Sequence, residues 1–196
     1  MTAELGHHAS PDEAIAARSN MLLGVKLGLL SEAMLFGALF AAYFVVRADS
    51  SGWPPISGFQ RPELVLPGLN SLLLVSSSVT MQLAVRAVRA GDGSRMRRWL
   101  GLTMLLGGIF ILVQGYEFSN NGFGLDSGIF GSTFYILTGF HGAHVLVGLG
   151  LMTIVMNRAR RGLVSREHDT ALEATSYYWH FVDVVWLFLF STLYVL

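Results

Sequence analysis

The sequence predicts an all-α integral membrane protein, a bundle of five transmembrane helices. Of the 196 residues, 53% are hydrophobic and only 13% are charged, whereas a soluble domain carries about a quarter charged residues. Five segments also reach the roughly 20 apolar residues that a helix needs to cross a bilayer. Strands of a membrane barrel would alternate over about ten residues, and runs such as LLGGIFILV do not alternate.

The expected spans follow one another along the chain at residues 21–46, 64–85, 99–116, 129–156 and 177–196. Residues 1–20 are polar and lack the basic start and short apolar stretch of a signal peptide. We therefore expect residues 1–20 to form a polar cytoplasmic segment and residues 21–196 to form one five-helix transmembrane domain.

The arginines predict the orientation of the bundle. The connection after the third span, residues 117–128, has no Lys or Arg, and the one after the first has only Arg47 and Arg61. The connections after the second and fourth spans are rich in arginine, with Arg86, Arg89, Arg95, Arg97 and Arg98 in one and Arg158, Arg160, Arg161 and Arg166 in the other. By the positive-inside rule the N-terminus is cytoplasmic and the C-terminus lies outside.

Charge and cysteine content exclude several classes of function. The formal net charge is zero, which argues against nucleic-acid binding, because that needs a basic surface. There are no cysteines, so disulfides, thiolate metal sites, iron–sulfur clusters and covalent c-type haem attachment are excluded.

Glu32 is the most informative polar residue within a span. It lies eleven residues after Met21, roughly 16 Å deep at 1.5 Å per residue, near the middle of the bilayer. Burial disfavours an unpaired carboxylate, so we expect a buried acid that is neutral or hydrogen-bonded. It is either a proton-related or partner-facing site, or a satisfied structural carboxyl.

Two pairs of polar residues three apart should each share a helix face. One pair is His141 and His144, and the other is His180 and Asp183. A histidine metal site usually needs three or four ligands, and no third intramembrane ligand is evident. We therefore expect hydrogen-bonding roles, and an ion pair or hydrogen bond that holds the bundle together at His180 and Asp183.

Further polar and aromatic residues have expected positions. Gln114 and Glu117 are expected to face a partner subunit or water at the end of the third span. The small polar residues in 69–71 and 76–80 are expected to allow close helix packing. Trp186 needs a packing explanation, whereas other aromatic residues are expected at the membrane interfaces, namely Trp53, Trp99, Tyr116, Tyr177, Tyr178 and Trp179. These patterns contain no nucleophile with a base and no phosphate loop, and leave enzyme subunit, transporter and channel open.

Several strings narrow the choice, because the chain resembles the cytochrome c oxidase subunit III family in all five spans. The strings that carry the resemblance are Ser31–Phe36, Leu69–Leu74 with Ser76–Thr80, Gln114–Phe118, Thr138–Val145 and Tyr178–Phe188. In the third string Phe118 replaces the family's tyrosine. The chain resembles the five-helix form, which lacks the first two of seven helices.

The resemblance implies a subunit of a haem–copper oxidase in a bacterial cytoplasmic membrane. In that family haem and copper are held by subunit I, and subunit III holds no redox centre, stabilises subunit I and supports proton uptake. The implied partners are subunits I and II and bound phospholipid, with no catalytic residue and no metal ligand in this chain. Either another polypeptide, often an extended subunit I, replaces the two absent helices, or the lipid cleft beside them is open.

The resemblance also assigns individual residues. Glu32 matches the family's buried glutamate, and His144 and Arg158 match positions near phospholipid headgroups. A guanidinium such as that of Arg158 can hold a phosphate bidentately. The remaining intramembrane polar residues are implied to be structural, namely His141, Glu117, Glu173, His180 and Asp183.

Two other functions stay open at this point. Quinol oxidases and some nitric oxide reductase systems use similar five-helix subunits, and nothing in this chain touches the electron donor. A proton channel or transporter built around Glu32 would need a continuous polar path, whereas the spans are mostly apolar.

Overall fold

The computed structural model describes residues 10–50, 53, 64–165 and 169–195, and within them it contains helices and no strand. Five helices are long and apolar enough to cross a membrane, so the predicted fold class is confirmed. They are α1 (Pro11–Asp49), α2 (Val65–Arg89), α3 (Gly93–Asn120), α4 (Gly128–Arg160) and α5 (Thr170–Phe190), and a π-helical turn, Ser191–Val195, ends the last. The expected features at residues 1–9, Arg61 and Arg166 lie outside the described residues.

Helix α1 begins ten residues before the expected span, so residues 11–20 form its first turns. A capping box accounts for the early start. The Glu13 amide donates to Ser10 Oγ at 3.3 Å, and the Ser10 amide donates to a Glu13 carboxylate oxygen at 2.7 Å. Pro11 occupies the first turn, where its missing N–H leaves no bond unmade.

Glycines end the two helices that carry the arginine-rich connections. Gly91 and Gly162 have φ values of 80° and 74°. After α2 the Asp92 amide donates to the carbonyl of Ala87 and the Gly91 amide to that of Val88, which is a Schellman motif. The same pair of bonds recurs around Gly162 after α4. These turns bring the arginines to one end of the bundle, which we call the arginine end.

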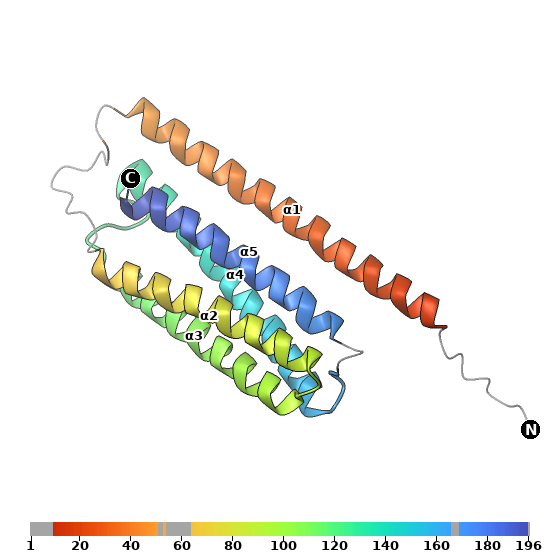
Figure 1. Ribbon diagram of the computed structural model, residues 1–196. Helices are drawn as coiled ribbons and strands as arrows, with labels where there is room; N and C mark the ends of the chain where they lie inside the picture. The colour runs from red at the N-terminus through yellow and green to blue at the C-terminus, as the bar shows by residue number, and fades with distance from the viewer. Residues whose placement is uncertain (1–9, 51–52, 54–63, 166–168, 196) are drawn as a thin grey trace, which may run out of the picture.

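Helices α2, α3, α4 and α5 form a closed four-helix arrangement, in which each packs on two of the others (Figure 1). Helix α1 lies outside this arrangement and packs on α5 and α4. In its most apolar stretch only 11% of the residues are buried in the chain, against 50% in α2 and α5. Among the α1 residues whose side chains are described, the buried ones are Phe36 and Tyr43, so the half of α1 nearer the C-terminus provides the apolar contact.

Small polar side chains make α2 the centre of the bundle's hydrogen bonding, as the packing interpretation of residues 69–80 predicted. Asn70 Nδ2 donates to the carbonyl of Phe110 on α3 at 3.2 Å. The hydroxyls of Thr80 and Thr103 are 2.7 Å apart between the same two helices. Hydroxyls are short enough to let backbones approach while satisfying polar groups that lipid cannot.

Two buried tryptophans of α5 complete this hydrogen bonding. Trp186 Nε1 donates to Ser71 Oγ at 2.8 Å, and the Trp186 and Phe110 rings make a T-shaped contact with their centroids 4.8 Å apart. That is the packing explanation its position required. Trp179 was expected at a membrane interface, and that expectation is wrong. Helix α5 begins at Thr170 rather than near Tyr177, so Trp179 lies deep in the bundle, fully buried.

Candidate functional site

Glu32 and His144 join the outlying α1 to α4. The Nε2 atom of His144 is 3.0 Å from a carboxylate oxygen of Glu32. The other ring nitrogen, Nδ1, is 2.7 Å from the carbonyl oxygen of Phe140. A carbonyl oxygen can only accept, so Nδ1 carries a hydrogen and donates it.

That assignment limits the protonation of the pair. If Nε2 also donates, the ring is an imidazolium facing a carboxylate. If Nε2 accepts, the donor is the protonated carboxyl of Glu32. Both arrangements leave the pair with no net charge, which reduces the penalty of placing ionisable groups inside a membrane.

The surroundings of this pair come from three helices. The ring of Phe36 meets that of His144 edge-on at 5.0 Å, and the Tyr178 hydroxyl on α5 donates to the carbonyl of His144 at 3.2 Å. The Glu32 side chain keeps 38% of its surface exposed. It is therefore hydrogen-bonded, as one expectation held, but only partly buried within this chain, because α1 packs on the bundle along one face.

His141 occupies a different environment from His144, although the two are three residues apart. It is fully buried, with its ring centroid 4.9 Å from that of Trp186 and 5.8 Å from that of Phe110. Neither ring nitrogen has a hydrogen-bond partner in the part of the chain that the structure describes. His141 thus points into the four-helix core while His144 faces α1.

Gln114 and Glu117 are buried in the bundle, with 4% and 9% of their surfaces exposed. The expectation that they face a partner subunit or water is wrong. Gln114 Nε2 donates to the carbonyl of Thr138 on α4 at 3.4 Å. This face of α3 turns inward because α3 packs on both α2 and α4, an arrangement that hydropathy along one helix cannot reveal.

Ser78 connects His180 and Asp183 of α5 to α2. Its hydroxyl is 2.9 Å from His180 Nδ1 and donates to a carboxylate oxygen of Asp183. A hydroxyl can donate one hydrogen and accept another, so Nδ1–H of His180 completes the arrangement. Asp183 is 5% exposed. The prediction of a bond that holds the bundle together is supported, with Ser78 as the connecting group.

Glu173 belongs to an ion-pair cluster at the arginine end, together with Arg18, Arg89 and Asp169. One guanidinium nitrogen of Arg18 lies 2.7 Å from Glu173 and 2.9 Å from Asp169. Arg89 is 3.3 Å from Glu173 and 3.6 Å from Asp169. Tyr177 donates its hydroxyl to Glu173 at 2.9 Å. The cluster ties α1, α2 and the start of α5 together.

Sequence reasoning missed Arg18, Arg89 and Asp169 as members of this cluster. One signal was available, because Asp169 and Glu173 are four residues apart and therefore one turn apart on a helix. The arginine partners come from the start of α1 and the end of α2, which the span order brings to the same side of the membrane. The pairing itself depends on which faces meet.

Comparison with known proteins shows the family of the chain. A family model described as cytochrome c oxidase subunit III matches residues 3–196. The chain belongs to the cytochrome c oxidase subunit III family. Members of this family are subunits of an oxidoreductase complex, and five spanning helices make this member a multi-pass membrane protein.

Individual relatives agree. The chain is 43% identical over 192 residues to cytochrome c oxidase subunit 3 of Synechocystis sp., which covers 97% of this chain and 79% of the relative. It is 40% identical over 176 residues to cytochrome c oxidase subunit 3 of Thermostichus vulcanus, covering 89% and 87%. A probable cytochrome c oxidase subunit 3 of Nocardia farcinica is 42% identical over 182 residues, covering 90% and 89%.

In this member of the subunit III family, no group of three or more His, Cys, Asp or Glu could hold a metal ion within the described ranges. Polar side chains such as Asn70, Ser78 and Glu32 make hydrogen bonds across helix interfaces of the bundle. Arg158, near the end of α4, is exposed and has no side-chain partner among the described residues. Its guanidinium is available to a ligand outside the chain.

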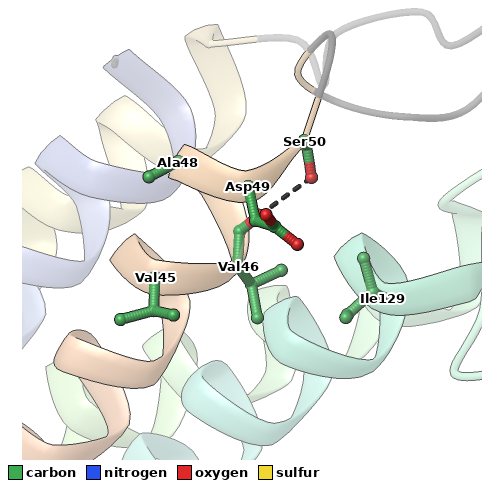
Figure 2. A pocket seen from close by; sticks show the side chains of 6 residues that line it. All are labelled: Val45, Val46, Ala48, Asp49, Ser50 and Ile129. Atoms are coloured by element: carbon green, nitrogen blue, oxygen red, sulfur yellow. Dashed lines mark hydrogen bonds between the residues drawn. The ribbon is translucent and has the colours of Figure 1, made fainter.

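A surface pocket lies at the end of the bundle opposite the arginines, between the last turns of α1 and the start of α4 (Figure 2). Ser50 Oγ donates to the carbonyl of Val46 at 2.8 Å there. Asp49 supplies the only ionisable side chain among the described residues that line it, which are Val45, Val46, Ala48, Asp49, Ser50 and Ile129. A single carboxylate beside aliphatic groups gives no catalytic arrangement.

Proposed function

We propose that this chain is the non-redox subunit III of a proton-pumping, aa3-type cytochrome c oxidase in a bacterial cytoplasmic membrane. The observation that carries the proposal is the family match over residues 3–196, with relatives of similar length named cytochrome c oxidase subunit 3. In this proposal subunit I holds the haems and copper, and this chain stabilises subunit I and supports proton uptake.

The polar groups within the spans support a structural role. The bonds from Ser78 to Asp183 and from His144 to Glu32 each join two helices of the same chain. Such bonds make the bundle rigid, as expected of a subunit that supports a neighbour holding the redox centres. The exposed side of α1, where Leu30 and Met34 keep 60% and 71% of their surfaces exposed, is the apolar surface that we propose faces other subunits and lipid.

We propose the orientation that the arginines predict, with the arginine end in the cytoplasm and the C-terminus outside. The ion-pair cluster of Arg18, Arg89, Asp169 and Glu173 lies at that end, where charged side chains can reach water. Labelling of single-cysteine variants in intact cells tests this directly, because the chain has no native cysteine. An impermeant thiol reagent should label a cysteine at Asp126 and leave one at Ser94 unlabelled.

A bound phospholipid is part of the proposal. Arg158 suits a headgroup phosphate because its guanidinium has no partner within the described chain. Both ring nitrogens of His144 are already engaged, by Glu32 and the carbonyl of Phe140, so this residue would act by positioning α1 rather than by binding the phosphate. We expect Arg158→Ala to loosen a bound lipid. Unchanged lipid content by mass spectrometry would count against this role.

Purification through a tag on this chain tests the main proposal. We expect the tagged protein to carry a larger subunit with haem and copper. Gentle removal of the chain should leave oxygen reduction active at first and shorten the number of turnovers before inactivation. A complex that contains the chain but no haem–copper subunit would end the proposal.

The nature of the neighbouring subunit II separates the remaining alternatives. A dicopper centre there indicates cytochrome c as the electron donor, and its absence indicates quinol. The names of the relatives favour cytochrome c.

A nitric oxide reductase system would reduce nitric oxide rather than oxygen. A channel built on Glu32 would give proton flux through the isolated chain in vesicles, and Glu32→Gln would abolish that flux. Against a channel, the hydrogen bonds of the Glu32–His144 pair end at the carbonyl of Phe140.

A further inference from the structure

A surface pocket near the start of α3 carries two arginines whose charge has no partner. It is lined by Arg95, Arg98, Trp99 and Leu102, all on one face of the helix. Both arginines are exposed, and neither guanidinium makes a hydrogen bond or ion pair with the part of the chain that the structure describes. The pocket lies at the arginine end, on a face of α3 that the other described helices leave exposed.

The charge of this pocket is strongly positive. The nearest acid in sequence, Asp92, already accepts a hydrogen bond from the amide of Arg95 at 2.8 Å as the helix cap. The acids Asp169 and Glu173, at the start of α5, pair instead with Arg18 of α1 and Arg89 of α2. Two like charges one turn apart repel one another, so an anion placed between Arg95 and Arg98 would relieve the repulsion and accept hydrogen bonds from both guanidinium groups.

The side chains next to the arginines have the character of a membrane interface. Trp99 is partly exposed while it also packs on the core, and tryptophan favours the headgroup level of a bilayer. Along the same face of α3 an apolar stripe continues from the pocket, with Leu102, Leu105, Leu106, Ile109 and Val113 each exposed or partly exposed. From Leu102 to Val113 the rise is roughly 16 Å at 1.5 Å per residue, about half of a hydrocarbon core of ~30 Å.

We propose that this face of α3 binds an anionic phospholipid, with its phosphate between Arg95 and Arg98 and an acyl chain along the stripe from Leu102 to Val113. The combination of charge, an interfacial ring and an apolar stripe one leaflet long matches the three parts of such a lipid. A free phosphate would use the arginines alone. This site is separate from Arg158 on α4, and it does not depend on which electron donor the oxidase uses.

Photo-crosslinking of the intact complex tests the site. The complex is purified through this chain and placed in nanodiscs of phosphatidylcholine that contain a trace of phosphatidylglycerol with a photoreactive headgroup. We expect crosslinks on the peptide that contains Trp99. Unlabelled phosphatidylglycerol should reduce them, and the same amount of additional phosphatidylcholine should not. Millimolar inorganic phosphate should leave them unchanged.

Charge variants supply the second measurement. Each arginine near a membrane surface contributes about 1 kcal/mol to binding of anionic lipid, so each of Arg95→Gln and Arg98→Gln should lower the crosslinking yield roughly fivefold. The double variant should lower the yield further than either single variant, but the two effects should not simply multiply, because both arginines hold the same phosphate. Arg97→Gln is the matched control, because Arg97 already donates to Ser94 Oγ at 3.2 Å and does not line the pocket. The double lysine variant should retain part of the yield, because it keeps the charge and loses the bidentate fork.

Three results would overturn the proposal. Equal yields from the wild type and the double glutamine variant would show that the arginines do not hold the lipid. Displacement by inorganic phosphate would indicate an anion site without a lipid. Protection of the Trp99 peptide by a neighbouring subunit, with no lipid crosslink in the wild-type complex, would show that a protein covers this face.

Discussion

The indole Nε1–H of Trp179 on α5 donates a hydrogen bond to Ser77 Oγ on α2 at 2.9 Å, with both residues fully buried. The rest of the indole ring fills the space beside two glycines on the other helices. A Cβ atom on Gly107 of α3 would lie 2.7 Å from the ring, and one on Gly148 of α4 would lie 2.8 Å from it. Trp179 thus sets the spacing of all four helices of the closed arrangement.

Substitution of either glycine by alanine should therefore loosen the bundle. The added methyl group meets a rigid ring that is fixed by its bond to Ser77, so Gly107→Ala and Gly148→Ala should each destabilise the fold by about 1–3 kcal/mol. The measurement is the temperature at which the purified complex loses this chain in detergent.

Neighbouring glycines provide matched controls. Gly108 and Gly150 have open space where a Cβ would lie. Alanine there should be neutral or should stabilise by up to about 1 kcal/mol, because alanine favours the helix. A Gly107→Ala complex as heat-resistant as the Gly108→Ala complex would refute the role assigned to Trp179.

Ser78→Ala should weaken the α2–α5 contact. It removes the group that bonds to both His180 and Asp183, and leaves a buried carboxylate without its donor. The expected loss of stability is about 1–3 kcal/mol. Ser76→Ala is the control, because the Ser76 hydroxyl is exposed and bonds only to the carbonyl of Leu72 in its own helix. Equal heat resistance of the two variant complexes would contradict this assignment.

His141→Leu should be tolerated although His141 is fully buried. Its ring nitrogens have no partner among the described residues, so a leucine of similar volume removes unsatisfied polar atoms and keeps the packing on Phe110 and Trp186. The complex should assemble in normal amount with unchanged or raised heat resistance. His141→Ala leaves a cavity and should destabilise by about 2 kcal/mol or more. A leucine variant worse than the alanine variant would indicate a bound partner for the ring.

The spans could be predicted from sequence because the membrane imposes a local requirement. Each helix must satisfy its own backbone and present an apolar surface of fixed length, which hydropathy records residue by residue. Helix ends were less predictable. The first turns of α1 extend beyond the apolar stretch because Ser10 and Glu13 cap them, and a polar helix end resembles a loop in hydropathy.

The polar contacts were predictable only in part. The resemblance drew attention to Glu32, His144 and Asp183, each of which makes an interhelical contact. Their partners depend on the rotation of one helix against another, which no local pattern contains. For the same reason Glu117 was expected to face a partner subunit or water, whereas α3 turns it into the bundle.

Glu32→Ala should reduce the durability of the complex rather than its chemistry. Without the carboxylate, His144 loses the partner of its Nε2 atom, and α1 loses this polar contact to α4 at mid-span. We expect normal initial oxygen reduction, weaker retention of this chain and earlier inactivation. Glu32→Gln should restore retention, because its amide can donate to the neutral ring. Complete loss of oxygen reduction in an assembled Glu32→Ala complex would contradict a non-catalytic role.

Arg18→Gln should free the arginine end of α1. None of the described side chains of α1 before Phe36 is fully buried. At the arginine end, Arg18 therefore supplies most of the attachment of α1 through its ion pairs with Asp169 and Glu173. Lys26 adds a weaker contact, with its Nζ 5.7 Å from the centre of the Tyr177 ring. Loss of a partly exposed ion pair is worth about 1 kcal/mol, so backbone amides in residues 12–30 should exchange with deuterium roughly fivefold faster. High salt should produce the same change in the wild type through screening.

Arg86→Gln is the control, since Arg86 is exposed and its guanidinium has no partner in the described part of the chain. If the exchange rates in α1 match those of this control, contacts with other subunits rather than the ion-pair cluster hold the start of the helix.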